Sequence, residues 1–321
     1  MNTGVRITAF AAAVAATFGT AYGVGKGIGP VGEPPAKAAH GEHASAPAEP
    51  GTAPAGAASA AGGLQVSDGG YTLDLETPTP AQGRSVLKFS VKDAGGKNVT
   101  AYTTEHGKEL HFIVASRDLT VFRHLHPVRA ADGTWSTPVD LPAAGGYKAF
   151  ADFKPAAKGA KGITLGADLA VPGAYAPRPL PAATPTATVD GYEVALGGTL
   201  VPGRAGELKL TVSKDGKPVT DLEPYLGAYG HLVALRDGDL AYLHVHPNEG
   251  GPGPVVSFTA TAPSAGSYRL FLDFQHGGKV RTAAFTVQAG PGGAPVSAPA
   301  SAPTSASSDE APHDAGGHEH G

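Results

Sequence analysis

Three histidines at a fixed spacing occur twice in this chain of 321 residues. The two sets lie 120 residues apart and consist of His111, His124 and His126, and of His231, His244 and His246. Each set closes in a His-x-His-Pro stretch, HLHP at 124–127 and HVHP at 244–247. A neutral imidazole nitrogen is the commonest metal ligand in proteins. The spacing therefore predicts that each set binds one metal ion.

The rest of the composition limits which metals fit. The chain has 13 histidines, one methionine and no cysteine, which excludes disulfides, thiolate zinc sites and iron–sulfur clusters. The soft sulfur ligands that Cu(I) prefers are also missing. We therefore expect a divalent ion, Cu(II) or Zn(II), bound by imidazole and oxygen. With 24 basic and 28 acidic residues, the chain has no basic excess to predict a nucleic-acid partner.

Other polar residues near these sets could complete a site. Asp152 and Asp273 follow apolar runs late in each repeat, where each could be a fourth ligand, an acceptor that orients an imidazole, or a solvated surface group. His276 is a possible additional ligand in the second repeat. Glu105 and His106 occur only in the first repeat, and we expect both to be solvated.

The elements that must position these histidines also occur twice. YKAFADF at 147–153 matches YRLFLDF at 268–274, and other matches keep offsets of 120 or 121. Apolar residues alternate with period two, and turn residues recur about every ten positions, as in antiparallel β-sandwiches of immunoglobulin-like type. We therefore predict an all-β chain with two tandem immunoglobulin-like sandwiches, at 64–173 and 174–288.

In the second repeat, a hairpin would bring the histidines together. Asp-Gly at 237–238 favours a two-residue turn, and this turn would place His231 directly opposite His244. Paired residues share a face, with Cβ atoms about 5 Å apart. His246 lies two positions further and points the same way. The three imidazoles are thus predicted to converge.

The first repeat allows the same register. A two-residue turn at Arg-Asp, 117–118, would pair His111 with His124. A slip of one residue would send His111 to the other face and break up the set. The metal-site prediction therefore depends on the hairpin register.

The flanking segments carry a different signal. Residues 7–25 have no charged side chain, and Arg6 precedes them, so 1–32 is predicted to be a signal peptide or an N-terminal helix that anchors the protein in the membrane. The Ala/Pro/Gly-rich stretch 33–63 and the histidine-containing tail 289–321 are predicted to be disordered. We therefore expect an exported protein, secreted or membrane-tethered, whose protein partner the sequence does not indicate.

One segment of the second repeat resembles a known family. DLEPYLGAYGHLVALRDGDLAYLHVHP at 221–247 is similar to the PYLG-x2-GH…HxHP segment of exported bacterial modules, loosely described as heavy-metal-associated. The resemblance implies a small β-sandwich in a secreted or membrane-tethered protein. It is weaker in the first repeat, where TTEHGKEL at 103–110 replaces PYLG-x2-G.

Two enzyme families share parts of the histidine pattern. LHVHPNEG at 243–250 resembles the HVH segment of copper–zinc superoxide dismutases, which are also β-sandwiches, but their later histidine segments and paired cysteines are missing here. His244, His246 and Glu249 resemble the cupin metal motif, but with a short spacing to the glutamate. G-x-S-x-G and phosphate-loop motifs are absent. We therefore expect no enzyme.

These observations favour an exported protein that binds copper or zinc and acts as a buffer, carrier or sensor in metal homeostasis outside the cytoplasm. The alternative is a non-catalytic adhesion or interaction module whose histidines are purely structural. An enzyme resembling superoxide dismutase is a third, weaker possibility.

Overall fold

The computed structural model describes residues 61–243 and 245–290, without the side chain of His246. The predicted N-terminal helix, nearly all of the predicted linker and most of the tail lie outside this range. Every element in the described range is a β-strand, which confirms the all-β class there. Over those residues, no helix is long and apolar enough to cross a membrane.

The first repeat contains ten strands, which form two antiparallel sheets in the orders β1-β2-β3-β8-β7 and β10-β9-β5-β6, with β4 paired to β9. The strands are β1 (Ser67–Asp68), β2 (Tyr71–Leu75), β3 (Gly83–Lys92), β4 (Tyr102–Thr103), β5 (Leu110–Ser116), β6 (Phe122–Leu125), β7 (Val128–Arg129), β8 (Thr134–Leu141), β9 (Gly145–Pro155) and β10 (Ile163–Val171).

The second repeat has the same plan, in sheets β11-β12-β13-β18-β17 and β16-β15-β19-β20, with β14 paired to β13. Its strands are β11 (Thr186–Val189), β12 (Tyr192–Gly198), β13 (Ala205–Lys214), β14 (Lys217–Pro218), β15 (His231–Arg236), β16 (Tyr242–Leu243), β17 (Val245–Pro247), β18 (Val255–Thr261), β19 (Gly266–His276) and β20 (Lys279–Ala289).

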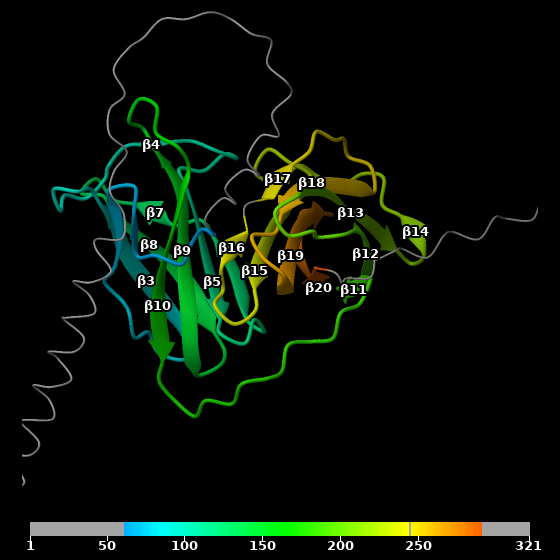
Figure 1. Cartoon of the computed structure of the whole chain (residues 1–321), viewed down its shortest axis with the longest axis horizontal. Coiled ribbons are helices and arrows are strands. Elements are labelled where there is room, and N and C mark those ends of the chain that lie inside the picture. The colour runs from blue at the N-terminus through cyan, green and yellow to red at the C-terminus, as the bar shows by residue number, and fades with distance from the viewer. Residues whose placement is uncertain (1–60, 244, 291–321) are drawn as a thin grey trace, which may run out of the picture. The chain divides into compact units, whose positions relative to one another are not determined.

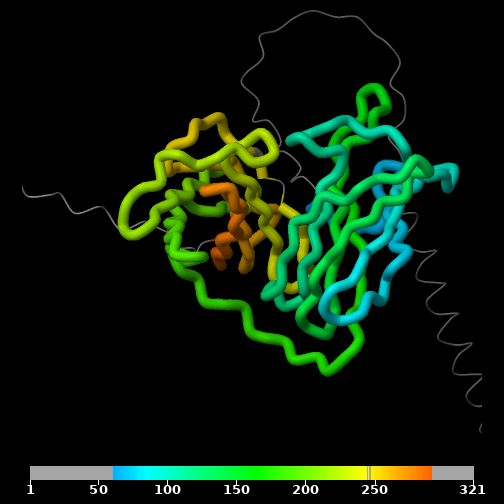
Figure 2. Tube along the Cα trace, turned by 180° about the vertical axis from the view of Figure 1, so that it is seen from behind, coloured from blue at the N-terminus to red at the C-terminus, as the bar shows by residue number. Residues whose placement is uncertain are grey.

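The strand order in each repeat is that of an immunoglobulin sandwich. In the first repeat, β2-β3-β8-β7 corresponds to the A-B-E-D sheet, and β10-β9-β5 to the G-F-C sheet. Figure 1 shows the strands of the first repeat in blue to green and the later strands of the second repeat in yellow to orange. Figure 2 follows the chain through the connection at 172–185, which has no strand of its own.

Alternating apolar residues build a separate core in each sandwich. Along β8 every second residue is buried, as expected for a strand with one face toward the core. In the first repeat, Phe89 and Phe112 stack across the two sheets with ring centroids 4.1 Å apart. In the second repeat, Phe258 and Phe285 lie in the corresponding core. Each repeat thus has its own apolar core between its two sheets.

A third apolar cluster contains residues of both repeats. Ile113 and Phe150 of the first repeat lie in it with Val233 and Phe271 of the second. Phe122 stacks on Phe271 with ring centroids 4.0 Å apart. The strands β5 and β15 are therefore buried on both faces.

The start of the described chain also contacts both repeats. The amide of Tyr242 donates to the carbonyl of Gly62, and the amide of Gly63 donates to the carbonyl of Thr164. Gly63 has φ +70, and a Cβ there would lie 2.5 Å from the Phe150 ring. A glycine is required at this position because any side chain would clash with that ring.

The predicted hairpin register is wrong by two residues in both repeats. His124 pairs with Ile113, and Leu243 pairs with Ala234, so each loop has four residues and not two. The reason is that Leu119 and Leu240, both with left-handed φ (56 and 60), are buried in the apolar cluster that the repeats share. Because the shift is an even number of residues, every side chain keeps its predicted face.

Candidate metal centre

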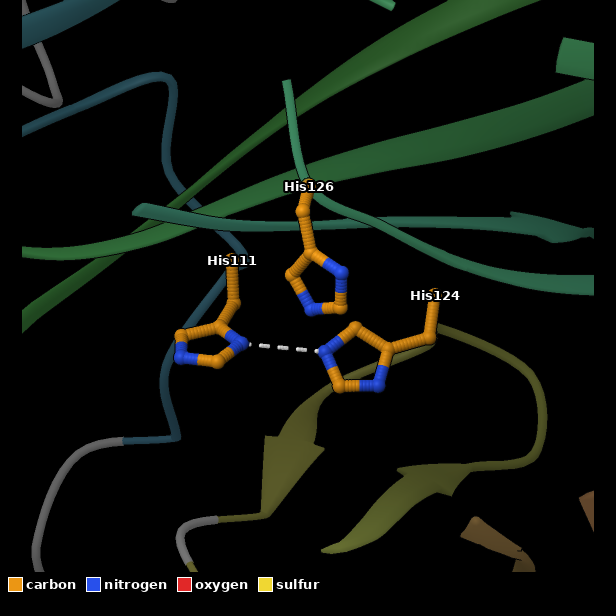
Figure 3. A group of neighbouring side chains, drawn as sticks. All are labelled: His111, His124 and His126. Carbon is orange, nitrogen blue, oxygen red and sulfur yellow. Dashed lines mark hydrogen bonds between the residues drawn. The ribbon is translucent and has the colours of Figure 1, made fainter. Parts of the chain in front are cut away.

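His111, His124 and His126 come together in the first repeat. His111 lies on β5, His124 on β6, and His126 directly follows β6. One ring nitrogen of each lies within 4.8 Å of the other two, and Figure 3 shows the three rings pointing toward one another. The predicted convergence of this set is therefore present, although the register that produces it differs from the predicted one.

Two of the rings have their outer nitrogens held by acceptors. Nε2 of His111 is 3.4 Å from the carbonyl oxygen of Glu105. Nδ1 of His124 is 2.7 Å from Oδ2 of Asp273, which belongs to the second repeat. The inner nitrogens, Nδ1 of His111 and Nε2 of His124, lie 3.1 Å apart (Figure 3). Such outer acceptors fix the tautomer and the orientation of a metal-binding imidazole.

The third ring follows the same pattern with a different outer partner. The hydroxyl of Tyr225, again from the second repeat, lies 3.4 Å from Nδ1 of His126. Nε2 of His126 is buried and has no hydrogen-bond partner among the described residues. A buried imidazole nitrogen without a partner carries a desolvation cost, and a cation in the cluster would remove that cost.

Asp273 positions the ring of His124. Its Oδ1 accepts from the Thr282 hydroxyl, and its Oδ2 lies 2.7 Å from Nδ1 of His124. A proton on Nδ1 of His124, toward this carboxyl group, leaves a lone pair on Nε2. That lone pair can accept from Nδ1 of His111, 3.1 Å away, or bind a metal ion.

The inner nitrogens can be linked by a hydrogen bond or by a metal ion. A hydrogen bond between His111 and His124 leaves Nε2 of His126 without a partner among the described residues. Nitrogens bound at about 2.0–2.1 Å to a tetrahedral zinc ion lie roughly 3.3 Å apart, close to the 3.1 Å between Nδ1 of His111 and Nε2 of His124. The three ligand nitrogens lie within 4.8 Å of one another, so the cluster can accommodate one metal ion.

The contact between His124 and Asp273 is buried. The two side chains are only 7% and 5% exposed. Within the described residues, no lysine or arginine forms an ion pair with Asp273. The contacts with His124 and Thr282 therefore compensate the burial of this carboxyl group.

Burial keeps the other imidazoles neutral. It lowers the pKa of His111 to about 3, and repulsion from His124 adds to that shift. Burial followed by repulsion from His124 lowers the pKa of His126 to about 4. Burial also lowers the pKa of His231. At neutral pH each of these rings is therefore uncharged, and one of its two nitrogens has a lone pair that can bind a metal ion.

Two further histidines lie beside the set. The ring of His231 is 6.3 Å from that of His111 and 6.2 Å from that of His124, measured between centroids. The ring of His106 is 5.7 Å from that of His231. These four histidines line a pocket of about 210 Å³. His106 is exposed, as predicted for a solvated residue, but it lies at a pocket that the sequence did not reveal.

The remaining predicted site residues are placed as follows. Asp152 pairs with His111 in the β5–β9 register, lines the pocket and accepts a 2.9 Å hydrogen bond from Thr164. Asp273 contacts His124 as described above. The side chains of His244 and His246 lie outside the described residues, so the second set stays a prediction.

His276 is not brought to the cluster. Its Nδ1 lies 2.7 Å from the Tyr192 hydroxyl, and its Nε2 lies 3.1 Å from a carboxylate oxygen of Asp221. It stands three positions beyond Asp273 on β19, so its side chain leaves the opposite face of the strand. The expectation that His276 is an additional ligand therefore has no support in the geometry.

Tyr225 was not anticipated as a residue of this site, and neither was the contact of Asp273 with a histidine of the other repeat. These contacts span 99 and 149 residues, and no local pattern encodes them. One signal was available. The apolar runs HFIVA at 111–115 and HLVAL at 231–235 are continuous and not alternating, which indicates strands buried on both faces.

Comparison with known proteins gives a family and a set of distant structures. A family model described as Domain of unknown function (DUF8832) matches residues 65–164 and again 187–290. No curated protein matches the chain.

The similar solved structures include an adhesin, a receptor and an adhesion repeat. The Yersinia pseudotuberculosis adhesin InvE is 12% identical with a TM-score of 0.22, over 69% of this chain and 60% of that chain. A marsupial T cell receptor is 11% identical with a TM-score of 0.22, over 67% and 61%. A tetra-tandem repeat in the extending region of a large adhesion protein is 14% identical with a TM-score of 0.24, over 68% and 49%. This chain thus spans less than two thirds of each, and similarities at these TM-scores carry no information about function.

Proposed function

The chain belongs to the family described as Domain of unknown function (DUF8832), and we propose that this tandem member binds a divalent metal ion through His111, His124 and His126. The ion is Cu(II) or Zn(II), because the chain has imidazole and oxygen donors but no cysteine. Asp273 and Tyr225 act as the outer partners that orient two of the three rings.

One observation carries this proposal. Each of the three imidazoles has its outer nitrogen held by an acceptor or a hydroxyl and its inner nitrogen in the cluster. Of the inner nitrogens, two lie 3.1 Å apart and the third is buried without a partner among the described residues. A hydrogen bond between His111 and His124 does not account for the third nitrogen, whereas a metal ion would engage all three.

The site suits reversible binding more than permanent storage. Three protein ligands leave a fourth position for water or an incoming ligand, and two of the three histidines, His111 and His124, line a pocket of about 210 Å³. A receiving molecule could enter there and take the ion by ligand exchange. We therefore propose a buffer, carrier or sensor of metal ions, acting outside the cytoplasm if residues 1–32 direct export as their sequence predicts.

The alternative is a non-catalytic adhesion or interaction module. The architecture by itself favours this alternative, because many cell-surface proteins are built from immunoglobulin-like sandwiches. A fold is compatible with many functions, however. The two proposals differ in whether the histidine cluster takes up an ion.

The test uses the full chain with its tail histidines removed, because short histidine tracts bind copper and zinc weakly by themselves. We define the tail-substituted chain as the full chain with alanine at His40, His43, His313, His318 and His320. Zinc and copper are titrated into it by calorimetry, in parallel with His124→Ala/His126→Ala and with His276→Ala as the matched control.

We expect the double variant to lose one bound equivalent and His276→Ala to lose none. Circular dichroism checks that both variants keep the β fold. A tail-substituted chain that binds neither metal, or a double variant with unchanged stoichiometry, would favour the interaction module.

A further inference from the structure

We infer that a small organic carboxylate binds in the pocket as the fourth ligand of the ion, with an oxygen on the ion and its negative charge paired with Lys108. This inference rests on the proposed function, because the carboxylate binds to the ion. His111 and His124, two of the three proposed protein ligands, line this pocket of about 210 Å³. A ligand that completes a tetrahedral site can therefore enter from it.

Lys108 lines the pocket without a carboxylate partner among the described residues. The other lysine of the pocket, Lys154, has its Nζ 3.1 Å from a carboxylate oxygen of Glu105. The carboxylate of Glu109 pairs with Arg129. Lys108 is half-buried and forms no ion pair with any described residue. Its positive charge is thus available for an anionic ligand.

A turn holds Lys108 near the proposed metal ligands. The carbonyl oxygen of Glu105 accepts from the amide of Lys108 at 3.0 Å and lies 3.4 Å from Nε2 of His111. Burial and the charge of His124 lower the pKa of His126, and the charge of Lys108 lowers it further. The turn thus orients one ligand and carries a positive charge that acts on another.

The second repeat keeps this turn but not its charge. Residues 105–108 and 225–228 each form a turn whose first and last residues exchange backbone hydrogen bonds. The second residue of each turn has a left-handed φ, of 48 and 53. Ala228 stands where the first repeat has Lys108. The turn therefore forms without a lysine at this position, so the charge of Lys108 is not needed for its backbone.

The charge of the loaded site favours an anion with one negative charge. Asp152 lines the pocket, and Asp273 contacts His124. Even with both aspartates ionised, the two carboxylates only offset the two positive charges of the ion. The positive charge of Lys108 then remains, and its attraction for an anion is stronger at a partly buried site than in water.

The lining of the pocket favours an organic anion. Phe153, Leu232 and Phe258 also line it, so an acid with a short hydrocarbon chain would bury apolar surface there, unlike chloride or hydroxide. Carboxylate oxygens bind zinc at about 2.0–2.2 Å and accept strong hydrogen bonds from ammonium groups. A volume of about 210 Å³ is below the roughly 300–1,000 Å³ of pockets for drug-sized ligands, which favours a small acid.

The test is an acetate titration of the tail-substituted chain loaded with one equivalent of Cu(II), followed by visible absorption and electron paramagnetic resonance. Perchlorate keeps the ionic strength constant. We expect acetate to shift both spectra and to saturate, because an oxygen ligand enters the coordination sphere of the ion. Propionate should bind up to about fourfold more tightly than acetate, since it buries one more methylene group.

Three lysine variants test the role of the charge. Lys108→Gln should weaken acetate binding roughly tenfold, because it removes the ammonium group that pairs with the carboxylate, and it should not weaken the binding of Cu(II). Lys108→Arg keeps the positive charge and should retain most of the acetate affinity. Lys97→Gln is the matched control, because Lys97 is exposed after β3 and does not line the pocket. Circular dichroism checks that each variant keeps the β fold.

The outcomes separate this inference from the proposed function. Spectra that acetate leaves unchanged, or equal acetate affinities of the parent and Lys108→Gln, would overturn the carboxylate ligand and leave the proposed function intact. Chloride that binds the loaded chain as tightly as acetate would overturn the choice of an organic acid. A tail-substituted chain that takes up neither Cu(II) nor Zn(II) would overturn both the proposed function and this inference.

Discussion

The two repeats have the same backbone but contribute differently to the site. In the first repeat, the turn at 105–108 reads Glu-His-Gly-Lys, and in the second, the turn at 225–228 reads Tyr-Leu-Gly-Ala. The first repeat supplies the three converging imidazoles, and the second supplies Asp273 and Tyr225, which hold two of them. The duplicated scaffold thus places imidazoles of the first repeat against polar side chains of the second.

Variants of the equivalent histidines His111 and His231 test most strongly whether the two repeats contribute differently to metal binding. His111→Ala removes an inner nitrogen of the first set, so the tail-substituted chain should lose the metal equivalent bound there. His231→Ala should leave that equivalent in place. Competition against a colorimetric zinc chelator measures both variants. Equal losses in the two variants would mean that both histidines bind the ion assigned to the first set.

The second-largest difference in metal affinity is expected between variants of the equivalent aspartates, Asp273 and Asp152. Asp273→Asn keeps the shape but removes the carboxylate that orients His124, and loss of such an outer partner commonly costs about 10–100-fold in metal affinity. Asp152→Asn leaves the contacts of His124 unchanged, so its effect on the first ion should be smaller. Calorimetry with Zn(II) gives both dissociation constants. The assigned role of Asp273 is wrong if the two variants weaken binding equally.

Acid should destabilise the folded apo protein, because two histidines of the site are buried as neutral rings. The folded-state pKa values of His111 and His126, about 3 and 4, lie below the value of about 6.5 for an unperturbed histidine. The unfolded chain therefore binds more protons as pH falls below about 6.5, so the free energy of unfolding of the apo protein falls from there toward pH 4.

The measurement is urea unfolding of the metal-free, tail-substituted chain between pH 7 and pH 4.5. His111→Gln should flatten the pH dependence, because it removes one of the shifted groups. His276→Gln is the matched control. A pH profile that His111→Gln leaves unchanged would contradict the burial of that imidazole in its neutral form.

Tyr225→Phe should have the smallest effect. The variant removes a hydroxyl that lies 3.4 Å from Nδ1 of His126, a long hydrogen bond, and keeps the backbone carbonyl that His231 contacts. We expect a loss of metal affinity of a few fold, near the lower end of the roughly 10–100-fold range for outer partners. A larger loss than in Asp273→Asn would reverse the assigned order of the two supports.

Much of the fold followed from local patterns. Period-two alternation and regularly spaced turn residues predicted an all-β chain, and every element of the described residues is a β-strand. The parity of the histidine spacing predicted that His111, His124 and His126 share a face. A register shift of two residues leaves every side chain on its predicted face. This prediction was therefore confirmed, although the predicted turn length was wrong.

What could not be predicted depends on contacts between the repeats. An apolar residue in a hairpin loop, such as Leu119, lengthens the loop because it packs into a cluster that both repeats build. The pairing of His124 with Asp273 depends on the same packing of one sheet on another. Sequence periodicity describes which face of a strand is buried but not which distant strand covers it.

X-ray absorption at the zinc edge, on the tail-substituted chain loaded with one equivalent of Zn(II), tests the metal site most directly. The account predicts about three imidazole nitrogens at roughly 2.0–2.1 Å, with the imidazole scattering lost in His124→Ala/His126→Ala. An ion surrounded mainly by oxygen, or a spectrum that the double variant leaves unchanged, would contradict a metal site at these histidines.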